Sequence, residues 1–374
     1  MSLGPNALPG VDSIDTPALV VDLDAMERNI ATMAAFCRQH QIAWRPHAKL
    51  HKSAALAQLL VQAGAVGACV QKTAEAEALV AGGVRDVYIS NEVVSLPKLE
   101  RIARMARSLQ AQNGQVSIAV DSLEGIRRLA AALNAVGASM RVFVEIDVGQ
   151  NRCGVQPGAP AVTLAQEVLR HPCLQFAGLQ AYHGKAQHLR SAGARRNAIA
   201  AVVAAVQHTR QLLEAAGIPV PLVTGAGTGS FIHEAASGVY GELQPGSFLF
   251  MDADYAANER DPAAPVFEHA LFVKTQVISV CATHAVCDAG HKSHAIDSGL
   301  PKVWNSALEY GNGGDEHGIL RGATLPSLGD TLWLVPGHCD PTVNLYDHLV
   351  GVRGGLQHGV VERHIRVDAR GALT

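Results

Sequence analysis

Short apolar runs and longer amphipathic segments alternate along the first part of this chain. The apolar runs are bounded by turn residues and predict strands, whereas the Ala- and Leu-rich segments between them have apolar residues at helical spacing. Several of these segments end near a glycine, as helices often do. We expect strands at 42–49, 66–71, 86–91, 116–122, 140–147, 175–183, 221–228 and 243–250. We expect helices at 24–40, 53–63, 74–81, 96–110, 123–135, 161–170 and 195–216.

Eight strands alternating with helices predict a (β/α)8 TIM-like barrel, with a doubly wound open sheet as the alternative because periodicity does not show closure. Beyond 261–265 convincing helices disappear, and alternating β segments at 271–280, 284–288, 331–335, 349–352 and 361–367 predict a mainly β C-terminal domain. The strand at 18–22 is not needed by the barrel and could pair with that domain. We therefore predict a barrel at 24–262 and a β-rich domain formed by 1–23 and 263–374.

Charge and cysteine content narrow the class of protein. The 374 residues contain 30 Lys and Arg against 33 Asp and Glu, a net charge of -3, which gives no footprint for nucleic acid or an anionic membrane. No apolar run is long enough for a membrane span, and the first residues lack the basic and apolar regions of a signal peptide. Seven cysteines without CxxC spacing fit free thiols in the cytoplasm better than disulfides or structural zinc.

The segment 44–52 concentrates basic side chains at the end of the first barrel strand. Read as a strand, it places Arg45, His47 and Lys49 on one face, where they would repel each other if buried without an anion. A bound phosphate, or a covalent bond that neutralises the lysine, would remove this repulsion. We interpret Lys49 as the lysine that bonds covalently to pyridoxal phosphate, with a pKa lowered by its cationic neighbours. The alternative is a solvated lysine at a strand end.

Two small-residue turns follow the seventh and eighth predicted strands. The first contains Gly225–Gly229 with the hydroxyl of Thr228, and the second contains Gly246 and Ser247. Barrels commonly hold a phosphate at this place, because backbone N–H groups can approach it there. An ordinary turn would look the same.

The fifth and sixth predicted strands end with further polar residues. Glu145 and Asp147 would share a face and are followed by Arg152, which suggests either a site or an internal ion pair. Gln180 and Tyr182 would likewise lie together, and the ring of Tyr182 could contact a planar cofactor or cap the barrel core. The chain lacks GxxxxGK[ST], HExxH and GxSxG, which argues against P-loop, zincin and α/β-hydrolase chemistry.

A possible metal site lies late in the chain. Prolines on both sides of His338-Cys339-Asp340 exclude a helix interior, and an extended chain would turn His338 and Asp340 to one side and Cys339 to the other. A divalent metal could bind the nitrogen and oxygen of this pair, although a lone HxD is more often structural. The turn at 315–318 could lie close to it or be an ordinary polar turn.

Taken together, these residues resemble the fold-type III (alanine racemase-like) pyridoxal phosphate enzymes, and within them the D-threonine aldolase and 3-hydroxy-D-aspartate aldolase group. The matches run in order along nearly the whole chain and include the segments 15–18, 45–52, 69–72, 145–147, 152–155, 178–182, 225–229, 246–247, 251–255, 288–290, 297–301, 315–318 and 336–342. The resemblance implies a homodimer, Lys49 as the cofactor lysine, and His338 and Asp340 as metal ligands. By analogy, Gln71, Arg152 and Tyr182 surround the cofactor ring, and Thr228, Gly229, Gly246 and Ser247 hold its phosphate.

Asp340 separates two activities within this superfamily. The similar D-serine dehydratases tend to carry His-x-Cys and use zinc, whereas an oxygen donor suits Mn²⁺ or Mg²⁺. The resemblance thus implies a metal-dependent aldolase (an aldehyde-lyase) that cleaves D-3-hydroxy amino acids of the D-threonine type reversibly to glycine and an aldehyde, with Lys49, His338 and Asp340 as catalytic residues.

Other activities remain open from the sequence. A 3-hydroxy-D-aspartate aldolase would give glycine and glyoxylate, and would need an extra cation such as His51, Arg45 or Lys292 for the side-chain carboxylate. A D-serine dehydratase-like lyase is the next alternative. A racemase would not explain the metal pair, and a non-catalytic cofactor carrier is usually a single barrel.

Overall fold

The computed structural model describes residues 8–374. The first seven residues lie outside this range, so the absence of a signal peptide and the start of the predicted segment 1–23 stay predictions. The described chain forms two sheets, one parallel and one mainly antiparallel. All seven cysteines are free thiols.

The parallel sheet contains eight strands and closes into a barrel. Its two end strands, β2 and β3, are joined by a bridge between His47 and Cys69, where the N–H of Ala48 donates to the carbonyl of Cys69 at 2.7 Å. This closure confirms the predicted barrel and excludes the open sheet. The strands are β2 (Ala43–Trp44), β3 (Ala68–Val70), β4 (Asp86–Ile89), β5 (Gln115–Val120), β6 (Met140–Glu145), β7 (Leu174–Ala181), β8 (Val223–Gly225) and β9 (Glu242–Leu243).

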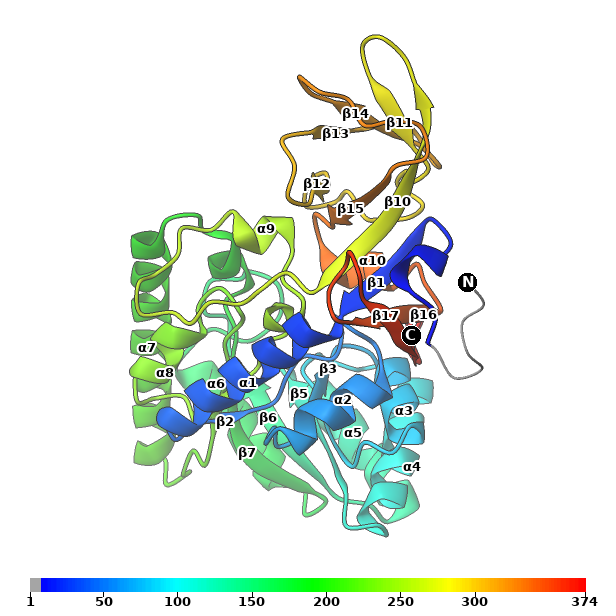
Figure 1. Ribbon diagram of the computed structural model, residues 1–374. Coiled ribbons are helices and arrows are strands. Elements are labelled where there is room, and N and C mark those ends of the chain that lie inside the picture. The colour runs from blue at the N-terminus through cyan, green and yellow to red at the C-terminus, as the bar shows by residue number, and fades with distance from the viewer. Residues whose placement is uncertain (1–7) are drawn as a thin grey trace.

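Helices surround the barrel, and α7 is the longest of them (Figure 1). The helices α1 to α7 follow the predicted segments closely because their apolar faces pack on the strands, whereas the short helices α8 and α9 were not predicted. The helices are α1 (Leu23–Gln39), α2 (Ala54–Gln62), α3 (Thr73–Ala81), α4 (Leu96–Gln110), α5 (Leu123–Val136), α6 (Ala159–Leu169), α7 (Ala192–Ala215), α8 (Phe231–Ala236) and α9 (Ala253–Ala256), with 3-10 turns η1 (Val11–Ser13), η2 (Gly184–His188) and η3 (Ser247–Leu249).

The barrel strands are shorter than predicted at the carboxyl end. β2 stops at Trp44, and β8 and β9 contain three and two residues, because the chain turns there to line a pocket. The apolar runs continue past these points and therefore look like strands in the sequence.

The second sheet contains nine strands. β1 pairs antiparallel with β10 and parallel with β16, which confirms that the early strand joins the C-terminal sheet. The short strands β12, β13 and β14 and the helix α10 were not predicted. The elements are β1 (Ala18–Asp22), β10 (Leu271–Val280), β11 (Ala285–Cys287), β12 (Lys302–Val303), β13 (Glu309–Asn312), β14 (Gly318–Arg321), β15 (Thr331–Val335), α10 (Cys339–Val343), β16 (His348–Arg353) and β17 (Val360–Arg366).

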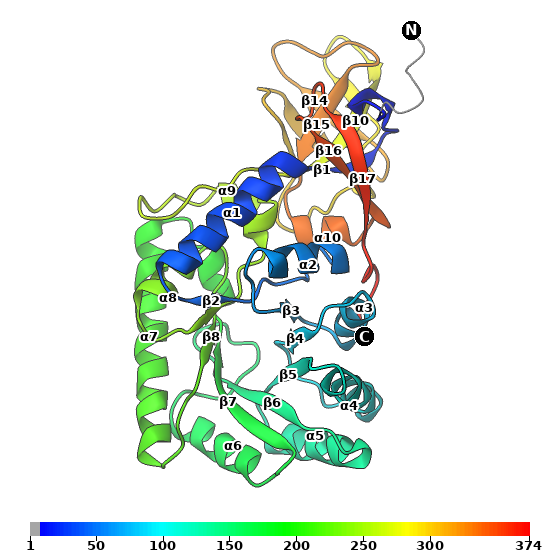
Figure 2. The same ribbon diagram turned by 60° about the horizontal axis from the view of Figure 1, so that its bottom comes forward.

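The helix α10 follows β15 and packs between the two sheets. It lies between the β-rich sheet and the barrel strands (Figure 2), while β10 runs away from the barrel and holds β11 at its far end. Two backbone hydrogen bonds fix the approach to α10 on the barrel side: the N–H of Ala253 donates to Pro336, and the N–H of Asp254 donates to Gly337. Within residues 8–374 no helix has the length and apolar character needed to cross a membrane.

Candidate active site

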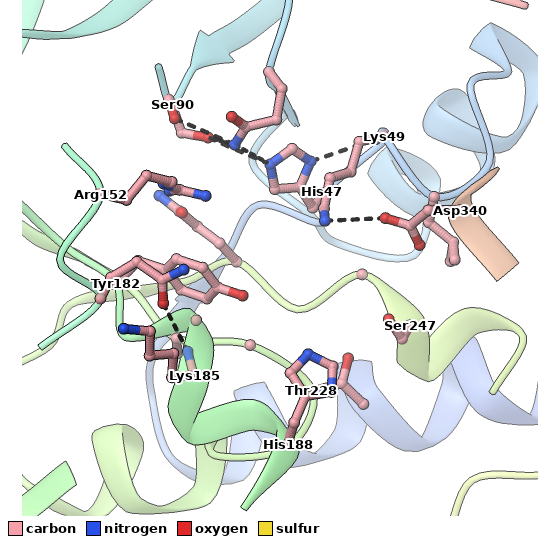
Figure 3. Close-up of a pocket in the computed structure, with 18 of the residues that line it drawn as sticks. His47, Lys49, Ser90, Arg152, Tyr182, Lys185, His188, Thr228, Ser247 and Asp340 are labelled. Atoms are coloured by element: carbon pink, nitrogen blue, oxygen red, sulfur yellow. Dashed lines mark hydrogen bonds and ion pairs between the residues drawn. The ribbon is translucent and has the colours of Figure 1, made fainter. Parts of the chain in front are cut away.

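A pocket of about 330 Å³ lies where the barrel strands end and α10 approaches them (Figure 3). Its lining brings together most residues singled out from the sequence: Lys49, Gln71, Arg152, Tyr182, Thr228, Gly246, Ser247 and Asp340. Residues far apart in the chain thus meet at the carboxyl edge of the barrel, where active sites of this architecture lie.

The basic segment after β2 is not one uniform strand face. Arg45 is 5 % exposed and is neutralised by Asp86 at 2.6 Å and Glu242 at 3.1 Å. Its charge therefore needs no bound anion, so the expected repulsion among Arg45, His47 and Lys49 was wrong. The chain turns after the His47 bridge, and this turn carries Lys49 into the pocket.

Lys49 forms an ion pair with a residue of the β-rich part of the chain. Its Nζ lies 3.0 Å from Oδ2 of Asp340, and the two side chains point toward each other across the pocket (Figure 3). The carboxylate of Asp340 raises the pKa of Lys49 above its ordinary value, with burial acting in the opposite direction. The expectation that cationic neighbours lower this pKa was therefore wrong for the chain alone, because Asp340 outweighs them.

His47 has a neutral ring, and it holds the backbone turn that carries Lys49. Burial and the charge of Lys49 place the pKa of His47 well below its ordinary value. Its Nδ1 accepts the backbone N–H of Lys49 at 3.3 Å, so the proton of the neutral ring is on Nε2, which faces Gln71 Nε2 at 3.0 Å and the Ser90 hydroxyl at 3.3 Å. The imidazole thereby fixes the turn that holds Lys49 and contacts Gln71 directly.

His338 and Asp340 lie at the start of α10 rather than on an extended segment. His338 precedes the helix with extended backbone and Asp340 is in its first turn, so the predicted extended geometry was wrong. A proline is tolerated in the first turn of a helix, which is why Pro341 does not prevent it. The two side chains still converge, with His338 Nε2 3.8 Å from Asp340 Oδ1.

The neighbours of this pair leave Nε2 of His338 available as a metal ligand. Asp297 Oδ2 lies 2.7 Å from His338 Nδ1 and orients the ring, as a carboxylate often does behind a metal-binding histidine. Cys339 is fully buried, and its Sγ contacts the carbonyl of Met251 at 3.5 Å, so the thiol points away from the pocket.

The two small-residue turns line the pocket, and in Figure 3 the side chains of Thr228 and Ser247 lie apart from the His47 ring. The Thr228 hydroxyl accepts the backbone N–H of Phe248 at 3.0 Å, which ties the first turn to the second. A Cβ on Gly246 would lie 3.2 Å from the carbonyl of His47, so the second turn passes close to the lysine loop. Gly229 lies outside the pocket lining, and its N–H donates to Gln187 Oε1 at 2.9 Å.

Three comparisons with known proteins agree on the family. The alanine racemase N-terminal domain family matches residues 21–254, and a serine dehydratase domain family matches residues 270–352. The chain is 44 % identical to a D-threonine aldolase of Arthrobacter sp over 99 % of this chain and 97 % of the relative. This chain belongs to the D-threonine aldolase group of alanine racemase-like proteins.

Two further relatives support this assignment. A 3-hydroxy-D-aspartate aldolase of Paracoccus denitrificans (strain Pd 1222) is 42 % identical over 98 % of this chain and 95 % of its own. The crystal structure of D-threonine aldolase from Filomicrobium marinum superposes with a TM-score of 0.94 at 44 % identity, covering 99 % of this chain and 100 % of the other. The resemblance noted from the sequence is therefore confirmed.

Several pocket residues of this aldolase-group chain were missed from the sequence. Gln150, Lys185, His188 and Tyr255 line the pocket, and Lys185 and His188 belong to η2, whose sequence has no helical periodicity. Lys185 is exposed and forms no ion pair within 4 Å in the described part of the chain. It is a basic residue just past a strand end, which is the one feature that could have indicated it.

The three side chains considered as cations for a substrate carboxylate are either neutral or paired with acidic residues. Burial lowers the pKa of His51 to about 3, so its ring is neutral. Arg45 is paired inside the barrel, and Lys292 pairs with Asp315 and Glu316. The turn at 315–318 thus forms an exposed polar cluster with Lys292. This agrees with its interpretation as an ordinary polar turn.

Glu145 and Asp147 do not share a face toward Arg152. Asp147 turns outward and accepts the N–H groups of Gly149 and Asn151, each at 3.0 Å. Within residues 8–374 neither acidic residue forms an ion pair with Arg152 within 4 Å, so the internal ion pair is wrong as well.

Proposed function

We propose that this protein is a pyridoxal phosphate- and metal-dependent aldolase that cleaves D-3-hydroxy amino acids of the D-threonine type reversibly to glycine and an aldehyde. The observation that carries the proposal is the contact between Lys49 and Asp340, 3.0 Å apart with His338 beside them. It joins a candidate cofactor lysine to a candidate metal ligand in one pocket, and the D-threonine aldolase relatives match 99 % of the chain.

The pocket residues fit the cofactor. Lys49 would bond to it, the backbone of the turns at Thr228 and Gly246 with the Ser247 hydroxyl would hold its phosphate, and Gln71, Arg152 and Tyr182 would surround its ring. Gly229 would act through the shape of its turn, since its N–H is occupied. The bound cofactor supplies an electron sink for the carbanion formed at Cα.

The pair His338 and Asp340 fits a divalent metal of the Mn²⁺ or Mg²⁺ class. Two ligand atoms that each lie about 2.1 Å from an ion are at most about 4.2 Å apart, and the observed 3.8 Å is inside this limit. Such an ion supplies a Lewis acid that lowers the pKa of the substrate β-hydroxyl. Asp297 keeps Nε2 of His338 directed to the ion by holding Nδ1.

The chain's own residues then divide the work. Lys49 offers an amine to the pocket. While that amine is protonated, the carboxylate of Asp340 balances its positive charge. The neutral ring of His47 fixes the lysine turn by accepting the backbone N–H of Lys49, and its Nε2 lies 3.0 Å from the Gln71 amide nitrogen. Tyr182 forms part of the wall, and burial raises the pKa of its hydroxyl, which keeps it protonated at neutral pH.

A second candidate is 3-hydroxy-D-aspartate aldolase, giving glycine and glyoxylate. Lys185 favours it, because its exposed ammonium, which has no ion-pair partner among residues 8–374, faces the same pocket and could bind a side-chain carboxylate. A D-serine dehydratase-like reaction is less well supported, since Cys339 is buried and directed away from the metal pair.

A glycine-release assay tests the proposal. The purified chain with pyridoxal phosphate and Mn²⁺ should release glycine from D-threonine, D-phenylserine or D-3-hydroxyaspartate, and EDTA should abolish release until Mn²⁺ is restored. Lys49→Ala and Asp340→Asn should lose the activity. Lys185→Met distinguishes the substrates: it should raise KM only for D-3-hydroxyaspartate if Lys185 binds the carboxylate. Ammonia and a keto acid in place of glycine would contradict the aldolase assignment.

Three further features belong to this proposal. We propose a homodimer, a cytoplasmic location, and a division into a barrel at 24–262 and a β-rich domain formed by 1–23 and 263–374. Sedimentation with and without pyridoxal phosphate would test the first of these.

A further inference from the structure

A second group of potential metal ligands lies beside the pocket and takes no part in the chemistry above. One ligand atom from each of Glu92, Asp121 and Cys153 lies within 4.8 Å of the others. None of these residues belongs to α10 or to the β-rich sheet. This group is therefore distinct from His338 and Asp340.

The barrel topology creates this cluster. Glu92 and Asp121 follow β4 and β5, and Glu145 ends β6, so their side chains arise at the carboxyl ends of three adjacent parallel strands. Cys153 returns to the same edge, because the N–H of Val155 donates to the carbonyl of Glu145 at 3.0 Å. The N–H of Gly154 donates to Asp121 Oδ2 at 3.1 Å, which fixes the loop beside the second strand end.

The carboxylate of Glu92 lacks the hydrogen-bond donors that a buried charge requires. Both carboxyl oxygens of Glu92 are buried and have no hydrogen-bond partner within residues 8–374. Glu145 is 5 % exposed and packs against Glu92. Burial and the charge of Glu92 raise the pKa of Glu145 to about 9, and burial with the charge of Asp121 raises the pKa of Glu92. A buried group of this kind must hold either a proton or a cation.

We propose that Glu92, Asp121 and Cys153 bind a divalent transition-metal cation, with Glu145 beside it. Two carboxylates and one thiolate form a mixed hard and soft ligand set, which suits borderline ions such as Zn²⁺ and Co²⁺ better than Mg²⁺ or Ca²⁺. The thiol loses its proton to solvent as the sulfur–metal bond forms. Burial and the charge of Glu92 raise the pKa of the free Cys153 thiol to about 12, so the proton leaves only when a metal replaces it.

This site has a structural consequence for the pocket. Cys153 directly follows Arg152, which lines the pocket from an exposed loop. A metal bound at Cys153 and at the ends of β4 and β5 fixes the position of that loop. Arg152 is then placed by the metal rather than by an ion pair of its own.

Cobalt binding tests the site because a thiolate ligand gives Co²⁺ an intense charge-transfer absorption in the near ultraviolet. The parent protein is the full chain carrying His338→Ala and Asp340→Ala, so that the first metal pair does not contribute. We expect one Co²⁺ per chain with the charge-transfer absorption. In this parent, Cys153→Ser should remove the absorption, and Glu92→Gln should weaken Co²⁺ affinity by about tenfold or more.

Matched variants separate this site from other thiols. Cys281 is exposed with His284 Nδ1 3.2 Å from its sulfur, so it is the other place where Co²⁺ could meet a thiolate. Cys281→Ser should keep both the absorption and the stoichiometry. No charge-transfer absorption in the parent, its persistence in Cys153→Ser, or unchanged affinity in Glu92→Gln would each overturn the proposal. Circular dichroism of each variant verifies the fold, and none of these readouts depends on aldolase activity.

Discussion

Replacing Asp340 by asparagine should make Lys49 more reactive toward pyridoxal phosphate, even though it should abolish catalysis. The carboxylate lies 3.0 Å from Lys49 Nζ and is the main cause of the raised pKa of this lysine. The nucleophile that attacks an aldehyde is the neutral amine. Below its pKa the lysine is mostly protonated, so a lower pKa increases the reactive fraction at neutral pH.

The size of the effect follows from the distance and the exposure of the pair. At 3.0 Å, Coulomb's law gives about 1.4 kcal/mol in bulk water and about 5.5 kcal/mol at an effective dielectric constant of about 20. The Lys49 side chain is 44 % exposed, so solvent screening places the interaction near the lower value. A change of about 1.4 kcal/mol corresponds to about a tenfold larger fraction of neutral amine.

The assay mixes cofactor-free protein with pyridoxal phosphate and follows the visible absorption of the lysine-bound cofactor over time. Asp340→Asn should attach the cofactor about tenfold faster than the wild type at neutral pH, and the pH dependence of its rate should move to lower pH. Asp297→Asn is the matched control, because Asp297 contacts His338 rather than Lys49 and should leave the rate unchanged. An equal or slower rate in Asp340→Asn would refute the argument.

Three further substitutions test the phosphate turns, the barrel interior and the backbone. Thr228→Val should weaken pyridoxal phosphate binding by about tenfold or more while leaving pyridoxal binding unchanged, measured by equilibrium titration, since the phosphate is the part of the cofactor that would contact the hydroxyl. Arg45→Met should lower the free energy of unfolding by about 3–5 kcal/mol in urea denaturation, because Glu242 loses its buried partner. Gly178→Ala should destabilise the barrel far more than Gly217→Ala, although both have positive φ, because only at Gly178 would the added Cβ overlap a neighbouring backbone carbonyl.

The barrel could be predicted from the sequence because each of its units repeats one pattern. Predicted and observed elements agree where an apolar face packs on the core, as in α4 (Leu96–Gln110) and β10 (Leu271–Val280), whose predicted bounds are those observed. The short strands β12 to β14 were missed because two to four residues do not establish a period. Their place in the sheet is set by tertiary pairing rather than by local propensity.

The candidate site was predictable in its residue types and less so in its geometry. Lys49 and the turn at Gly246 could be identified because barrel sites lie at strand ends. The pair His338 and Asp340 was identified, but its backbone conformation was predicted wrongly, because prolines exclude a helix interior but not the first turn of a helix. The cluster at Glu92 was not identified at all, since its members follow three different strands and meet only once the sheet forms.

Asp340 contacts both Lys49 and His338, and this connection implies that cofactor binding and metal binding are coupled. The carboxylate is paired with the Lys49 ammonium in the chain alone, and a metal ion at His338 would compete with that ammonium for it. A covalent bond that removed the positive charge of Lys49 would leave Asp340 without its cationic partner and make it a better metal ligand. A metal ion bound first would likewise lower the pKa of Lys49 by replacing its counter-ion. Thermodynamic linkage requires these two effects to be equal, so cofactor and metal should increase each other's affinity by the same factor in the wild type. The coupling should disappear in Asp340→Asn, because that side chain carries no charge for either partner to compete for.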